Sequence, residues 1–168
     1  QFFQSVRRMR IIDERHKRLA MPWKPLACPV ELLSLSDEPG ARVRATVSEF
    51  GPLLLARVLE LNDTQSSVLT VLFQYCDGHQ LPLLDLKDLK AVLQWAAEDG
   101  QKALKDESGQ ISPASLNTIL RKVNALEAQG AEAFFGEPSF EVADLLKKDP
   151  DGKGIIHILR LVDLQQKP

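Results

Sequence analysis

Residues 112–126 read SPASLNTILRKVNAL, and this stretch decides the expected fold class. A serine followed by Pro113 is typical of a helix start, because a proline in the first helical turn loses no hydrogen bond. Apolar side chains then recur every three or four residues, which is the period of one buried helix face. They are Leu116, Ile119, Leu120, Val123 and Leu126. The stretch therefore predicts an amphipathic helix that ends near Gly130.

Similar patterns upstream predict further helices. Pro52 opens a dense apolar run, Asn62 begins a capping-box pattern, and Asp85 is placed to cap a third helix. A short segment after Ser139 has the pattern of one or two more helical turns. Because short connections between amphipathic helices favour antiparallel packing, residues 51–147 are expected to form a helical bundle.

Strand-like segments flank this bundle. Residues 28–35 (CPVELLSL) are apolar and bounded by turn residues, residues 42–48 alternate between apolar and polar, and residues 155–161 are rich in β-branched side chains. The first two segments fit either a hairpin or two neighbours in a larger sheet. The expected fold class is mainly α with a small β component, in which the bundle is inserted between strands of a partial α/β core. The expected units are a basic N-terminal helix and linker (1–27), two core strands (28–50), the bundle (51–147) and a return strand (148–168).

Charge is unevenly distributed along the 168 residues, although the net charge is only −2. Residues 1–25 hold seven Lys and Arg against two acids, whereas the remainder holds fourteen against twenty-one. A helix over residues 2–20 carries most of the excess positive charge. It is either a solvated or interdomain helix, or a contact to nucleic-acid phosphates. The candidate contact residues are Arg7, Arg8, Arg10, Arg15, Lys17 and Arg18.

Composition excludes several classes. No apolar run approaches the roughly 20 residues that a membrane span needs. Cys28 and Cys76 are too few for a disulfide framework and lack zinc-ligand spacing, so both are expected to be reduced, buried thiols in a cytoplasmic protein. The first residues resemble no signal peptide, and the sequence is expected to be an internal segment of a longer protein.

Two glycine-containing motifs resemble ligand-binding loops. Residues 149–160 superficially match a calcium-binding EF-hand loop, but Lys153 and Arg160 stand where oxygen ligands belong, so a turn into a strand is the favoured interpretation. Gly152-Lys153-Gly154 also lacks the spacing of a phosphate-binding loop. Asp85 at the end of LPLL is better explained as a helix cap than as a Mg²⁺ ligand.

No catalytic combination emerges from the remaining polar residues. His16, His79 and His157 are far apart, and His157 is expected on a strand face. Ser48, Glu49 and Glu137 have no nucleophile, base or metal partner that the sequence shows. The sequence therefore predicts no catalytic, cofactor-binding or metal-ligating residue.

Several blocks of the sequence nevertheless point to a protein family. They include VRATVSEFGPLLLAR (43–57), LNDTQ (61–65), LLDLKDL (83–89), FFGEP (134–138) and GIIHIL (154–159). Together, from about Pro29 to Lys167, they resemble the bacterial HerA-like helicase and translocase ATPases, in the region known as the HerA-like C-terminal domain.

The resemblance implies a parent protein with a RecA-like motor core. Such a parent is expected to bind ATP and Mg²⁺, to assemble as a homohexamer and to move double-stranded DNA, while its phosphate-binding loop and acidic Mg²⁺-binding strand flank the present residues. Without those parts, the segment is expected to be structural, shaping a subunit interface or the rim of a ring, and not catalytic. The alternatives are a stand-alone helical protein-interaction module using the exposed face of residues 85–130, or a nucleic-acid-binding arm through residues 2–20.

Overall fold

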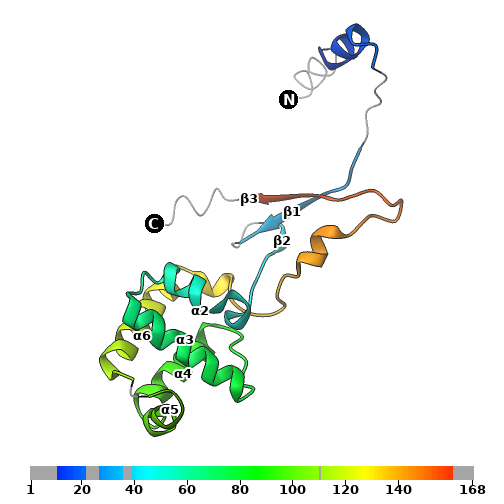
Figure 1. The fold of residues 1–168 in the computed structure, drawn as a ribbon. Coiled ribbons are helices and arrows are strands. Elements are labelled where there is room, and N and C mark those ends of the chain that lie inside the picture. Colours follow the sequence, from blue (N-terminus) through cyan, green and yellow to red (C-terminus); the bar gives the residue numbers. More distant parts are fainter. Residues whose placement is uncertain (1–10, 22–26, 36–38, 110, 161–168) are drawn as a thin grey trace.

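A computed structural model describes residues 11–21, 27–35, 39–109 and 111–160. It shows a mainly helical chain with one small parallel sheet (Figure 1). The helices gather at one end, the sheet lies beside them, and a separate helix over residues 11–18 stands clear of both. The expected basic helix is thus confirmed for residues 11–18, and its first half lies outside the described residues.

The bundle consists of five helices. They are α2 (Val47–Val58), α3 (Asp63–Gly78), α4 (Leu86–Ala97), α5 (Gln101–Ser108) and α6 (Pro113–Ala128). Helix α6 packs against α4 and α3, and α2 packs against α3. The buried side chains of these helices form one continuous hydrophobic core. Lys90 on α4 and Glu127 on α6 add an ion pair with an Nζ–Oε1 distance of 2.6 Å.

The helix starts follow the expected capping chemistry with one exception. Asn62 and Asp85 each cap a helix by accepting a hydrogen bond from a backbone N–H of the first turn, as predicted. Both also complete a capping box, which the sequence predicted only for Asn62. Ser112 occupies the cap position before Pro113, but its side chain makes no capping hydrogen bond. The proline therefore marks the start of α6 through its fixed backbone angle and not through a serine cap.

The apolar face of α6 is only partly buried. Leu116, Ile119 and Val123 are almost fully buried, whereas Leu120 and Leu126 pack at the core margin and remain half-buried. Five equally buried positions were expected, so the phase of the helix was predicted correctly and the width of its buried stripe was overestimated.

The sheet has three parallel strands in the order β2-β1-β3. They are β1 (Val30–Ser34), β2 (Ala41–Arg42) and β3 (Ile156–Arg160). The expected first and last strands are confirmed. The hairpin alternative is wrong, because β2 runs parallel to β1.

The strand expected over residues 42–48 is also wrong. Only Ala41–Arg42 form a strand, and Thr46 instead caps α2, which begins at Val47. The capping box between Thr46 and Glu49 directs the backbone into a helix despite the alternating pattern. The bundle thus starts before residue 51. Gly51 interrupts α2 with φ 77°, and Pro52 opens its second part, so the predicted role of Pro52 is confirmed.

Two short 3-10 helices follow α6, η1 (Ala131–Ala133) and η2 (Val142–Leu146). The turn expected after Ser139 is η2, but its N-cap is Glu141. Val142 and Leu146 are strongly exposed, so η2 contributes little to the bundle core. Figure 1 places η2 between the bundle and the connection to β3.

Candidate functional site

Two segments that connect the sheet with the bundle lie side by side. They are residues 43–46 and residues 134–140, and together they are called the junction. The backbone N–H of Ala45 donates to the Phe134 carbonyl at 3.1 Å, and the Gly136 N–H donates to the Ala45 carbonyl at 3.0 Å. This pairing is a short parallel bridge outside the sheet. The entry to the bundle and the exit from it are therefore bound directly to each other.

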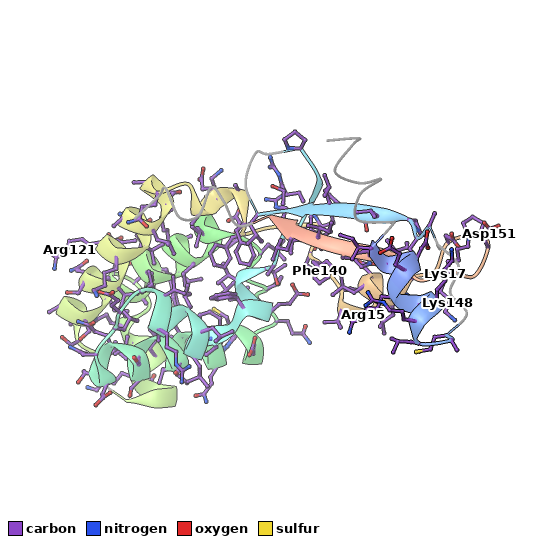
Figure 2. All side chains as sticks on the ribbon, turned by 90° about the horizontal axis from the view of Figure 1, so that it is seen from above. Arg15, Lys17, Arg121, Phe140, Lys148 and Asp151 are labelled. Atoms are coloured by element: carbon purple, nitrogen blue, oxygen red, sulfur yellow. The ribbon has the colours of Figure 1, made fainter. Side chains whose placement is uncertain are left out.

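Arg44 is the centre of the junction. Its Nη1 donates to the Glu137 carbonyl at 2.6 Å and its Nη2 to the Phe135 carbonyl at 2.9 Å, while its own carbonyl accepts from the Phe140 N–H at 2.7 Å. Figure 2 shows Phe140 between the bundle and the sheet. Gly136 has φ 129°, and a Cβ there would lie 2.5 Å from Arg44 Nη2, so a side chain at this position would require the guanidinium to move. The guanidinium thus fixes the returning segment through its backbone.

Glu49 binds the start of α2 to the same returning segment. One of its carboxylate oxygens accepts from the backbone N–H and the hydroxyl of Thr46, both at 3.0 Å, and the other accepts from the Ser139 hydroxyl at 3.0 Å. The hydrogen bond from the Thr46 backbone, with smaller contributions from the two hydroxyls, lowers the pKa of Glu49. The carboxylate is therefore held ionised as a structural acceptor.

Three phenylalanines close the junction against the bundle. The ring of Phe50 makes edge-to-face contacts with Phe134 at 5.9 Å and with Phe135 at 5.3 Å between centroids. The rings of Phe134 and Phe135 meet in the same manner at 5.1 Å. Such pairs are favourable beyond the area they bury. The junction is therefore held by hydrogen bonds and by packing of aromatic side chains.

The three histidines do not come together into a site. His16 and His79 each bond through Nδ1 to a carbonyl of their own helix region, and His79 also stacks on Tyr75. His157 lies on β3, as predicted, with Nδ1 3.1 Å from a carboxylate oxygen of Glu31 on β1. Across the described ranges, no three His, Cys, Asp or Glu residues are grouped so as to hold a metal ion.

The segment that resembles an EF-hand loop is a tight turn before β3. A carboxylate oxygen of Asp149 accepts from the Lys153 backbone N–H at 2.7 Å, and the Asp149 N–H donates to the Lys153 carbonyl at 2.9 Å. Lys153 Nζ lies 3.8 Å from Asp151, which Figure 2 shows at the tip of the turn. The favoured interpretation of a turn leading into a strand is confirmed.

The two cysteines are both free thiols. Cys76 is buried, and burial followed by the nearby Asp77 charge raises its pKa, so the thiol stays protonated. Cys28 is only half-buried, contrary to expectation, and it lies two residues before the start of β1.

The candidate nucleic-acid residues divide into two groups. Arg7, Arg8 and Arg10 lie outside the described residues. Arg15, Lys17 and Arg18 are exposed on the helix over residues 11–18, where Figure 2 shows Arg15 and Lys17 projecting from it. The same helix carries Asp13 and Glu14, so its described part is only weakly basic.

An apolar patch on α2 remains uncovered in the described part of the chain. Leu53, Leu54 and Val58 are 73%, 51% and 50% exposed, and together they are called the α2 patch. A groove of about 350 Å³ adjoins Val58 and runs toward the last turns of α6. Lys122 lines this groove and donates to the carbonyls of Leu59 and Glu60 at the end of α2, at 2.8 and 2.7 Å.

The sequence also matches a known family along nearly its whole length. The model of the helicase HerA-like C-terminal family covers residues 6–168. The chain belongs to this family. Searches of curated proteins and of solved structures gave no match. Within the described residues, no helix of the HerA-like chain is long and apolar enough to cross a membrane.

Sequence reasoning missed the residues that organise the junction of this HerA-like chain. The alternating pattern over residues 42–48 predicts a strand position for Arg44, and the pattern after Ser139 predicts only a short helical turn. The sequence shows no partner for Glu49. Their partners lie about 90 residues away in the chain, so no local pattern announced them.

Proposed function

We propose that this chain is a structural part of a HerA-like ATPase, in which the bundle is inserted into the parallel sheet of a RecA-like core. The main support for an insertion is that β1 and β3 pair in parallel, although the entire bundle lies between them in sequence. The junction supports the proposal, because it brings both ends of the bundle back to the same side of the sheet. The exposed aliphatic side chains of β1 and β3 are consistent with a larger core around the sheet; they are Val30, Leu32, Ile156, Ile158 and Leu159.

The ATP and Mg²⁺ of such a parent fit no site in the described residues. These residues hold no cluster of metal-ligating side chains, and Asp85 is engaged by the backbone of α4. In the proposal both ligands bind elsewhere in the parent protein. The chain alone is therefore expected to hydrolyse no ATP, since phosphoryl transfer depends on a phosphate-binding loop and a metal.

The α2 patch is proposed as the surface through which the bundle contacts a neighbouring subunit of a homohexameric ring. Three apolar side chains over two helical turns, beside a groove, form the kind of uncovered surface that marks protein contacts. Two exposed charged residues, Arg57 and Glu60, lie beside it near the end of α2. Such a polar rim around an apolar centre is typical of interfaces.

Sedimentation velocity over a range of concentrations tests this role. The wild-type chain is expected to self-associate, and Leu54→Lys is expected to weaken association at least about tenfold, which corresponds to about 1.4 kcal/mol. Val142→Lys is the control, because Val142 is also an exposed aliphatic residue, at 72% against 51% for Leu54, but lies on η2. Equal association of the two variants, or a wild-type chain that stays monomeric at all concentrations, contradicts the interface proposal.

The exposed cations of the N-terminal helix support a second proposal, in which Arg7, Arg8, Arg10, Arg15, Lys17 and Arg18 contact the backbone of double-stranded DNA. Phosphate contacts make affinity fall with salt, by a slope of about 0.9 per neutralised phosphate on a log–log plot. Replacing Arg15 and Lys17 with Gln is expected to lower that slope by about 2. An unchanged slope, with unchanged affinity, assigns the helix to a purely structural role.

A further inference from the structure

We draw no further inference here: the strongest candidate, the exposed aliphatic surface of β1 and β3, belongs to the larger core already proposed, and nothing in the described part of the structure shows which segment covers it.

Discussion

Replacing Gly136 with alanine tests whether Arg44 holds the junction together. The new Cβ would lie 2.5 Å from Arg44 Nη2, whereas ordinary contacts begin near 3.4 Å. The guanidinium must therefore retreat by about 1 Å, a shift that forfeits well-packed contacts. The 2.9 Å hydrogen bond to the Phe135 carbonyl then breaks. Phe135 is buried, so water does not readily replace the lost donor.

The expected magnitude has two parts. A hydrogen bond to a charged group contributes about 1.5 to 3 kcal/mol to the free energy of unfolding. Alanine at φ 129° adds backbone strain of about 1 to 3 kcal/mol. Gly51 separates the two effects, because it also has positive φ but a Cβ there meets no atom within 4 Å. Gly136→Ala is therefore expected to destabilise the chain by about 1.5 to 3 kcal/mol more than Gly51→Ala.

Urea unfolding followed by circular dichroism measures both variants. A double-mutant cycle with Arg44→Ala completes the experiment, because without the guanidinium Gly136→Ala retains only its backbone strain. The two glycine variants should then cost similar amounts. If Gly136→Ala and Gly51→Ala are already equal in the wild-type background, or if the Arg44→Ala background leaves the excess unchanged, Arg44 does not anchor the returning segment.

Three further predictions concern the core, the acid response and calcium. Ile119→Ala is expected to lower the free energy of unfolding by about 2 to 5 kcal/mol, because Ile119 is fully buried. Arg121 is exposed, so Arg121→Ala should change the free energy of unfolding by no more than about 0.5 kcal/mol. Similar values for both variants in urea melts would show that the wrong side of α6 has been assigned to the core. The lowered pKa of Glu49 stabilises the folded chain above the ordinary glutamate pKa of about 4.3, and this contribution is lost as the pH falls from there through the folded-state value. Glu49→Gln should therefore flatten the acid limb of the stability profile, and an unchanged limb contradicts the Thr46 and Ser139 contacts. Millimolar calcium should leave the amide resonances of residues 149–154 unmoved, because Lys153 stands at a ligand position; saturable local shifts refute the charge argument.

Local chemistry predicted much of the fold and little of the site. Asn62 and Asp85 cap helices as expected, because a capping hydrogen bond joins residues only two or three apart. The same logic, applied to the alternation over 42–48, failed because the Thr46–Glu49 capping box has a stronger local effect than a two-residue period. Lys122 lies outside the apolar stripe of α6, where the helix pattern by itself predicts a solvated charge. Its Nζ instead binds the end of α2, more than 60 residues away in the chain.

The sequence by itself determined the helical character of residues 52–128, the turn before β3, and membership in the HerA-like family, because each depends on residues that are close together in the chain or on their order. Tertiary structure alone decided that β1 and β3 are parallel neighbours, that Arg44 binds the carbonyls of Phe135 and Glu137, and that the α2 patch is left uncovered. The physical reason is that apolar periodicity specifies which side of an element seeks burial, whereas the partner that buries it, or leaves it exposed, is set by packing between segments far apart in sequence.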